Sequence, residues 1–445
     1  MNIAYLSPLP LGGVECLPKE RLAALLEEAR GRTLALVAPL CEEQIDRQYS
    51  PIMSPLAWDL GHIAAFADLW LARAGGSEPV RPDLFEVYDA TETPRSRRGD
   101  LPFLRCEDAL AYGREILERA LALLEEVDVS AEGDRLNARA LVWNMLIEHE
   151  HQHSETMIQA MQLAGEDIPS PASEAAGGAG VPAAAGTGPR MVLVEGGPAL
   201  LGAGIEGFAY DNERPQHAVE VASFEIDLIT VTNGDYLAWI EEGGYHRREW
   251  WSERGWAWRE REGAERPLFW TADGRDRRFD RTEPLDPDLP VTHVSAHEAE
   301  AFARAHGKRL PTEAEWEKAA TWDPGAGRKR RFPWGENQPD AERANLDLSA
   351  GGPEPAAARP DGASAYGVLG MTGDVWEWTA GEFIGYPGFE PFPYREYSEI
   401  FFGTGMRVLR GGSWATRPTI RPTFRNWDLP ERRQLFVGFR CVRDV

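Results

Sequence analysis

The sequence is poor in cysteine, has no long apolar run and carries no excess of basic residues. Its four cysteines (Cys16, Cys41, Cys106 and Cys441) show no CxxC spacing, which predicts a reducing cytoplasm and no disulfide framework. No stretch of about 18 uninterrupted apolar residues occurs, so no membrane span is expected. The N-terminus lacks a basic segment followed by an apolar one, so no secretory signal is expected either.

The excess of acidic residues limits which kinds of molecule the protein can bind. The formal net charge is −25, which argues against a nucleic-acid partner because a polyanion would be repelled. Such a surplus otherwise indicates solubility and no particular function. The length of 445 residues predicts two or three domains, each with a sizeable core.

The first third of the chain has the periodicity of long helices. Four segments repeat apolar residues at the spacing of one helix face: Arg21–Arg47, Ser54–Arg73, Cys106–Val127 and Asp134–Gly165. Ser54 is the expected N-cap of the second helix, and Pro55 is its expected first residue. Four long helices predict an antiparallel bundle, whose interior is a common place for metal sites.

Histidines gather on the last of these helices. His149 and His153 are one turn apart on the apolar stripe and can bind one metal ion, whereas His151 is rotated by roughly 200°. His62 lies on the apolar face of the second helix and is also aimed inward. A lone inward histidine is more often a hydrogen-bonded core residue, but two stacked ones favour a metal. The sequence therefore predicts a three-nitrogen site.

The amino-acid composition and the predicted secondary structure change after Pro169–Pro189, a segment rich in Ala, Gly and Pro. Beyond it, helices are few, tryptophans are dense and strand-like runs are short. Strands are expected at Arg190–Val194, Ala218–Ile226 and Gly438–Val442, and helices at Asn233–Glu242, at His297–His306 and from Thr312, where Thr312 and Glu315 match a capping box. The sequence predicts a multi-domain α and α+β protein: a helical bundle (1–168), a linker (169–189) and a loop-rich α+β domain (190–445).

Six segments of the last region resemble the formylglycine-generating/sulfatase-modifying fold, a C-type-lectin-like α+β domain. They are GGPALLG, RLPTEAEWEKAA, FPWGE, MTGDVWEW, RVLRGGSW and GFRCVRD, in this order. The N-terminal four-helix bundle resembles the DinB-like metal-binding bundles. Joined in this order, the two parts resemble the ergothioneine-biosynthetic sulfoxide synthases, non-haem iron enzymes that couple a thiol to hercynine using O₂.

The resemblance implies a ligand set. The HxxxHxE signature of that family matches His149, His153 and Glu155, and its WDxGH segment supplies His62. These are the three histidines that helical periodicity already selects, and the resemblance implies that they hold Fe(2+). No carboxylate of the last helix is expected on the metal-facing side.

The resemblance also implies residues for hercynine. Gln152, Asn426 and Trp427 are expected around it, and an aromatic face such as that of Trp427 suits a trimethylammonium group. A tyrosine of the family assists sulfoxide formation. The candidates for it lie in one aromatic segment: Tyr386, Tyr394 and Tyr397.

The thiol substrate implied is γ-glutamylcysteine. Its recognition matches Asp428 and Arg432, with Arg95 and Arg98 from the loop between the second and third helices. Asp428 can pair with a substrate ammonium group, and the arginines can pair with carboxylates. Cysteine itself, or a selenium donor, is the alternative within the same chemistry.

Other functions compete with this interpretation. The last helix also spells HExxH, which would make the protein a zinc hydrolase with Glu150 as general base. The extended zincin motif would need Gly and His where Thr156 and Gln159 stand. Formylglycine generation needs two cysteines near the C-terminus, but only Cys441 is present and Phe436 occupies the other position. A binding module without redox chemistry is the non-enzymatic alternative.

Overall fold

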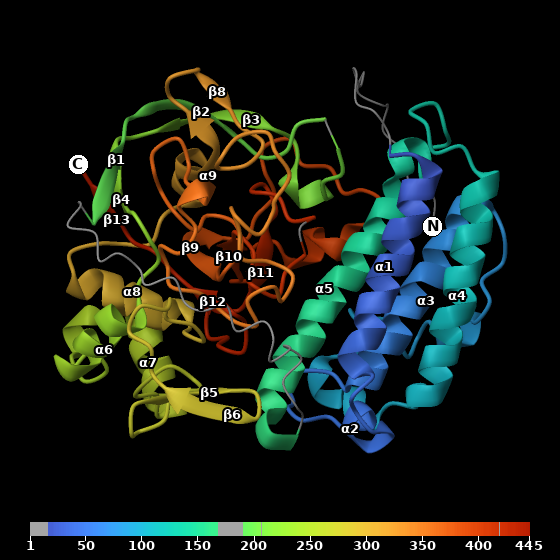
Figure 1. The fold of residues 1–445 in the computed structure, drawn as a ribbon, viewed down its shortest axis with the longest axis horizontal. Coiled ribbons are helices and arrows are strands. Elements are labelled where there is room, and N and C mark those ends of the chain that lie inside the picture. The colour runs from blue at the N-terminus through green and yellow to red at the C-terminus, as the bar shows by residue number, and fades with distance from the viewer. Residues whose placement is uncertain (1–16, 168–189, 206, 418) are drawn as a thin grey trace.

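The computed structural model describes residues 17–167, 190–205, 207–417 and 419–445. A helical bundle lies on one side and a mixed helix-and-strand region on the other (Figure 1). The expected linker, Pro169–Pro189, lies outside the described residues. Within the described ranges, no helix is long and apolar enough to cross a membrane.

The bundle confirms the predicted helical region. It consists of α1 (Lys19–Val37), the short α2 (Glu42–Asp46), α3 (Leu56–Gly75), α4 (Cys106–Glu126) and α5 (Leu141–Ala164). Each long helix contributes buried apolar side chains to a shared core, for example Leu22, Leu71, Ile116 and Ile158. This burial of one apolar face per helix stabilises the bundle.

Three helix boundaries differ from the prediction. The first expected helix divides after Val37, because Pro39 has no amide hydrogen to continue the helical bonding. Helix α3 begins at Leu56, so Pro55 is the N-cap, and the hydroxyl of Ser54 accepts a hydrogen bond from Arg98. Helix α5 begins seven residues late, since Arg139 and Ala140 have left-handed backbone angles.

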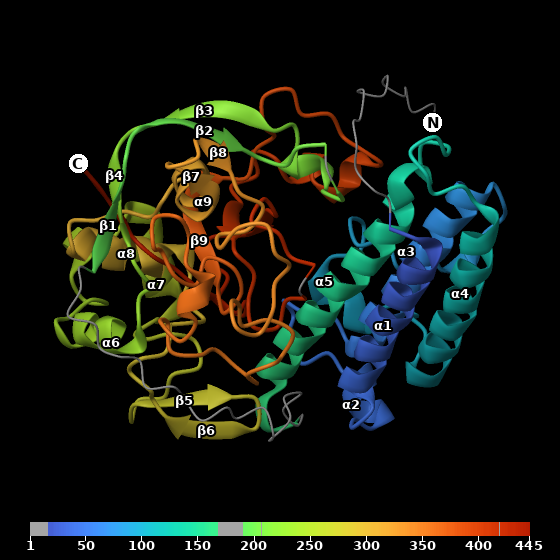
Figure 2. The ribbon, with the colours of Figure 1, turned by 45° about the horizontal axis from the view of Figure 1, so that its top comes forward.

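Helix α5 lies between the rest of the bundle and the C-terminal region in both ribbon views (Figures 1 and 2). It packs against α1 and α3 on its bundle side. On its other side it reaches the C-terminal region through side-chain hydrogen bonds, among them those of Glu155 and Gln162. One helix therefore forms a wall of both regions.

The C-terminal region is built on two small sheets. One has the order β1-β4-β13, from Met191–Val194, Phe224–Asp227 and Val442–Asp444. The other has the order β11-β10-β9-β12, from Asn426–Asp428, Arg407–Arg410, Trp376–Glu382 and Val437–Gly438. Three two-stranded pairs complete it: β2–β3 (Gly197–Leu201, His217–Val221), β5–β6 (Arg275–Arg278, Arg281–Pro284) and β7–β8 (Trp322–Asp323, Arg328–Lys329).

Four helices flank these strands: α6 (Asn233–Glu241), α7 (Glu253–Glu262), α8 (Ala296–Ala305) and α9 (Glu313–Thr321). The predicted capping box of α9 is confirmed, with Thr312 and Glu315 capping each other. Sequence reasoning missed α7, whose N-cap is Ser252. The expected strand Ala218–Ile226 is two strands, because β3 pairs with β2 whereas β4 belongs to the first sheet.

Candidate metal centre

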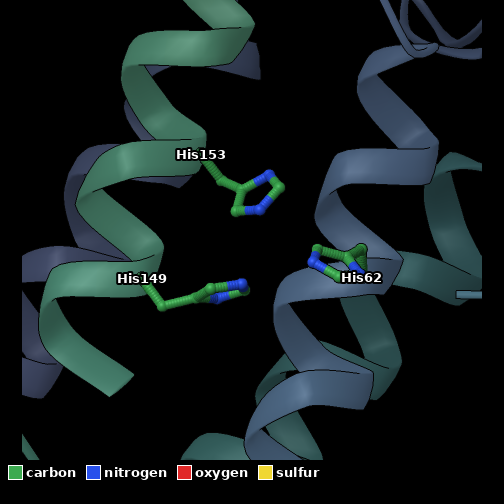
Figure 3. Close-up of side chains that lie close together, drawn as sticks. All are labelled: His62, His149 and His153. Carbon is green, nitrogen blue, oxygen red and sulfur yellow. The ribbon is translucent and has the colours of Figure 1, made fainter. Parts of the chain in front are cut away.

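Three histidines of the bundle converge on one point. His62 comes from α3, and His149 and His153 come from successive turns of α5 (Figure 3). One ring nitrogen from each lies within 4.8 Å of the others. His62 and His149 are buried, and His153 is half-buried. This spacing allows a single metal ion to contact all three imidazoles.

Hydrogen bonds orient two of the rings. Nδ1 of His62 donates to the backbone carbonyl oxygen of Tyr88 at 2.7 Å, and Nδ1 of His153 donates to Oδ1 of Asp59 at 2.9 Å. Each bond occupies Nδ1 and leaves the Nε2 lone pair free for a ligand role. Gly61 makes the first bond possible, because any Cβ there would lie 2.0 Å from the Tyr88 hydroxyl.

The electrostatics keep the rings of His62 and His149 neutral. Burial lowers the pKa of His62 well below its ordinary value, and the nearby charge of His153 lowers it further. Burial, then the charges of His153 and His62, lower the pKa of His149 in the same way. Neutral imidazole is the form that binds a metal, so these two rings are in the form that can bind a cation near neutral pH.

The donor set fits a transition metal. Neighbouring carboxylates of α5 are used elsewhere: Glu150 pairs with Arg30 at 3.1 Å, and Glu155 accepts from Trp376 at 2.8 Å. Three imidazole nitrogens suit Fe(II), Zn(II) or Cu(II) and do not suit the hard oxygen-seeking ions Mg²⁺ and Ca²⁺.

Aromatic rings enclose the triad. Phe66 stacks on His149 with ring centroids 3.7 Å apart, and Trp58 stacks on His62 at 4.8 Å. Tyr394 of the C-terminal region contacts Phe66, with centroids 6.1 Å apart. Such a shell limits water around the site and fixes the ring planes.

Residues of the C-terminal region reach α5 beside His153. The side-chain amide of Gln152 donates to the hydroxyl oxygens of Tyr210 and Tyr397, each at 3.2 Å. Tyr397 stacks on Tyr210 at 4.1 Å, and its ring meets Trp427 edge-on at 5.5 Å. The structure thus brings Gln152, Tyr397 and Trp427 together on the interdomain side of the triad. Asn426 lies next to Trp427 on β11.

Tyr386 has a different environment from the other two candidate tyrosines. Its hydroxyl donates to Glu313 at 3.2 Å, and the guanidinium of Arg425 lies 4.1 Å from its ring centre. These contacts are internal to the C-terminal region. Of the three candidates, Tyr394 and Tyr397 contact residues next to the histidine triad. Tyr386 makes its contacts elsewhere, inside the C-terminal region.

Asp428 and Arg432 lie together at the end of β11. Their side chains are 3.6 Å apart. Burial raises the pKa of Asp428, and the positive charges of Arg95 and Arg432 oppose that rise. The charge of Arg95 in the bundle loop therefore acts on this carboxylate. The three form a small charged group (Arg95, Asp428 and Arg432) contributed by both regions.

Arg98 is hydrogen-bonded inside the bundle. It is buried, donates to the carbonyl oxygens of Thr93 and Ala90 and to Ser54, and lies 3.7 Å from the ring centre of Trp58. These bonds use three of the five N–H donors of its guanidinium, and its role in thiol binding stays a prediction. It supports Trp58, which in turn stacks on His62.

Sequence reasoning gave no role to Asp59, Tyr88 or Tyr210. Asp59 had a signal, since it lies one turn before His62 in the WDxGH segment and on the same helix face. The Tyr88 carbonyl and the Tyr210 hydroxyl come from loops far away in sequence, so no local pattern marks them.

Two known protein families match the two parts of this chain separately. Residues 25–157 match the DinB superfamily, and residues 179–445 match the sulfatase-modifying factor enzyme 1-like domain. The hercynine oxygenase of Mycolicibacterium smegmatis is 47% identical over 443 residues, which cover 96% of this chain and 99% of that protein. The chain belongs to the hercynine oxygenase family. The hercynine oxygenase of Mycobacterium tuberculosis is also 47% identical, with the same shares covered.

Membership of the hercynine oxygenase family confirms three expectations. The chain is an enzyme of the oxidoreductase class, its resemblance to the ergothioneine-biosynthetic sulfoxide synthases is correct, and its fold joins a DinB-like bundle to a sulfatase-modifying domain. The formylglycine-generating enzyme of Streptomyces coelicolor is 31% identical over 62% of this chain and 96% of that protein.

The rival activities have little support in the geometry. The Cys441 thiol is fully buried, and burial raises its pKa well above the ordinary value, so it is not a reactive thiolate. Phe436 packs against Trp414 where formylglycine generation would need a second thiol. Glu150, the base expected of a zinc hydrolase, is paired with Arg30.

Proposed function

We propose that this oxidoreductase joins hercynine to γ-glutamylcysteine at a mononuclear non-haem Fe(II) site, with O₂ as oxidant and a sulfoxide as product. The observation that supports it best is the triad of converging imidazoles in a chain of the hercynine oxygenase family. The reaction breaks one C–H and one S–H bond and forms C–S and S–O bonds. The four electrons reduce O₂, one oxygen atom entering the sulfoxide and the other leaving as water.

The triad would hold the iron through His62, His149 and His153. Bound there, Fe(II) supplies one-electron chemistry with O₂ and a positive charge that lowers the pKa of a coordinated thiol. Asp59 and the Tyr88 carbonyl keep the two rings oriented, which holds the centre in one geometry. Phe66 and Trp58 exclude water from it.

The interdomain side of the triad suits hercynine. Hercynine carries a trimethylammonium group and a carboxylate, which call for aromatic faces and for polar donors. Trp427 and Tyr397 lie edge-on to each other there, and cation–π contact with such rings contributes about 0.5–2 kcal/mol. The Gln152 amide, now bonded to two tyrosine hydroxyls, can donate to the substrate one helix residue away from His153.

The charged group of Arg95, Asp428 and Arg432 suits the γ-glutamyl end of the thiol. That end carries one ammonium and one carboxylate, which match Asp428 and the two arginines. Cysteine alone is shorter and would place its own charges close to the sulfur. We therefore assign γ-glutamylcysteine as the sulfur donor.

A single-turnover experiment tests the assignment. The protein is loaded with Fe(II) without oxygen, given hercynine with γ-glutamylcysteine, cysteine or no thiol, and then exposed to O₂. Mass spectrometry should find the sulfoxide of hercynine and γ-glutamylcysteine, with zinc-loaded protein as the inactive control. Product with cysteine in preference to γ-glutamylcysteine would correct the donor, and peptidase activity of the zinc form would refute the proposal.

Replacing Arg432 by alanine should raise the KM for γ-glutamylcysteine by roughly ten- to a hundred-fold. Loss of a charge-assisted contact of this kind costs about 1.5–3 kcal/mol. The KM for hercynine should hardly change, because Gln152 and Trp427 are untouched. Arg432→Lys is the matched control, because it keeps the charge but loses the guanidinium geometry. Its KM for γ-glutamylcysteine should lie between those of the wild type and Arg432→Ala. Equal damage to both substrates would contradict the assignment.

Replacing Tyr397 by phenylalanine should lower sulfoxide formation by about a hundred-fold, in the range of a lost proton donor or acceptor. The ring contacts with Tyr210 and Trp427 are kept, and iron content should be unchanged, so only the hydroxyl is tested. Tyr386→Phe is the control, since its hydroxyl bonds to Glu313 inside the C-terminal region. Product and iron are measured together for both variants. Loss of product in Tyr386→Phe but not in Tyr397→Phe would mean that Tyr386, and not Tyr397, assists sulfoxide formation.

A further inference from the structure

One buried carboxylate holds both ends of the tyrosine loop (Phe392–Ser398), which carries two of the three candidate tyrosines. Oδ2 of Asp211 accepts a hydrogen bond from the backbone amide of Phe392 at 3.2 Å, and Oδ1 accepts one from the hydroxyl of Ser398 at 2.6 Å. Asp211 and Ser398 are both buried, so water competes little for these bonds. The position of Asp211 therefore fixes both ends of the loop.

The two tyrosines of this loop contact the surroundings of the triad. The ring of Tyr394 lies 6.1 Å from that of Phe66, which stacks on His149. The hydroxyl of Tyr397 accepts from the side-chain amide of Gln152 on α5 at 3.2 Å. A shift of the loop would therefore move both phenols relative to the metal centre.

Asp211 is itself held in place by neighbours outside the loop. It begins the short helical turn Asp211–Glu213. Glu213 accepts from the backbone amide of Tyr210 at 2.9 Å and from Nε of Arg421 at 2.8 Å. Tyr210, the residue before Asp211, stacks on Tyr397 with ring centroids 4.1 Å apart. The turn and the residue before it thus anchor the loop by hydrogen bonds and support one of its rings by stacking.

Burial of this carboxylate has a cost, which its hydrogen bonds offset in part. Burial raises the pKa of Asp211 to about 6, and the negative charge of Glu213 adds to the rise. Hydrogen bonds from Ser398 and from the backbone amides of Phe392 and Asn212 oppose the rise. Two of these three donors belong to the tyrosine loop, so the loop is the main partner of the buried carboxylate.

We propose that Asp211 is a positioning residue for sulfoxide formation, because it fixes the tyrosine loop so that Tyr394 and Tyr397 lie beside the triad. The inference rests on the proposed function, in which a tyrosine assists sulfoxide formation. Asp211 acts through the loop and not on a substrate. A misplacement of about 1 Å can lower a rate by about a hundred-fold, so two hydrogen bonds at the ends of a loop can control the chemical step.

Replacing Asp211 by alanine in the full-length protein removes both anchors of the loop. The kcat for sulfoxide formation should fall by about ten- to a hundred-fold. Iron content and the KM for γ-glutamylcysteine should be unchanged, since the triad and the group of Arg95, Asp428 and Arg432 are untouched. Asp211→Asn retains one acceptor oxygen and should recover part of the kcat. Glu390→Ala is the matched control, because Glu390 is an exposed carboxylate just before the loop.

Hydrogen exchange of the metal-free protein tests the anchoring without turnover. The backbone amides of the tyrosine loop should exchange faster in Asp211→Ala, whereas those of α5 should keep their wild-type rates. Ser398→Ala removes one anchor only and stands in if Asp211→Ala does not fold. It should speed exchange at its own end of the loop and lower kcat less than Asp211→Ala does.

Combined variants separate positioning from general stability. Asp211→Ala should have little further effect on kcat in whichever of Tyr394→Phe and Tyr397→Phe lacks the assisting phenol. An undiminished effect in both backgrounds would overturn the inference, and so would wild-type kcat or wild-type loop exchange in folded Asp211→Ala. A wild-type protein that forms no sulfoxide would refute the proposed function instead, and loop exchange distinguishes that case because it needs no turnover.

Discussion

Replacing His149 by alanine is expected to abolish tight metal binding and all sulfoxide formation. His149 supplies one of three donor nitrogens and contacts both other rings of the triad. Changing an outer-shell partner already weakens metal binding by about 10- to 100-fold, so removal of a ligand should exceed that. Iron titration and metal analysis of the purified variant measure the loss directly.

His151→Ala is the matched control on the same helix. His151 is also buried, but it faces α1, where burial and then the charge of Arg32 lower its pKa to about 3. This variant should keep the full iron content and most of the activity. Normal iron binding and full activity in His149→Ala would end the ligand assignment, whatever His151→Ala shows.

Replacing Glu155 by alanine is expected to destabilise the protein by roughly 3 kcal/mol and to remove most of its activity. The carboxylate accepts from Trp376 at 2.8 Å, from Ser413 at 2.7 Å and from Thr416 at 2.6 Å. Alanine leaves these three buried donors without their acceptor. Activity should fall because the C-terminal residues beside the triad shift, and a misplacement of about 1 Å can lower a rate by about a hundred-fold.

Denaturant unfolding and iron content separate the two effects of Glu155. Stability should fall in Glu155→Ala while metal binding persists, since the three proposed ligands come from α3 and α5 alone. Glu155→Gln retains one carbonyl oxygen as acceptor and should lose clearly less stability. Unfolding of Glu155→Ala at the wild-type denaturant concentration would show that these hydrogen bonds do not hold the two regions together.

The bundle was the predictable part of the structure. Helical periodicity alone places His149 and His153 on one face and aims His62 inward, because side-chain direction on a helix follows from the repeat. Periodicity does not register a missing amide hydrogen or a left-handed residue, so the break at Pro39 and the late start of α5 were missed. The contacts of Arg98 with Ser54 and Trp58 could not be predicted either, because these partners are distant in sequence.

The fold class of the C-terminal region was predictable, but the pairing and register of its strands were not. Its strands are two to seven residues long and pair with partners far apart, such as β12 with β9, so no local pattern sets their register. Its contacts with the bundle depend on that register. The meeting of Gln152 with Tyr397, 245 residues apart, follows from tertiary packing alone. The three tyrosines could not be ranked before that packing was known.

Helix α5 restricts how such a protein can be recombined. Its inner face carries His149 and His153, and its outer face carries Glu155, whose partners Trp376, Ser413 and Thr416 belong to the other region. A chimera that takes the bundle from one relative and the C-terminal part from another inherits the two halves of this contact from different parents. Whether the chimera folds and is active should depend on whether the parent of its C-terminal part has an indole and hydroxyls at these positions. The overall sequence identity of the two parents should matter less.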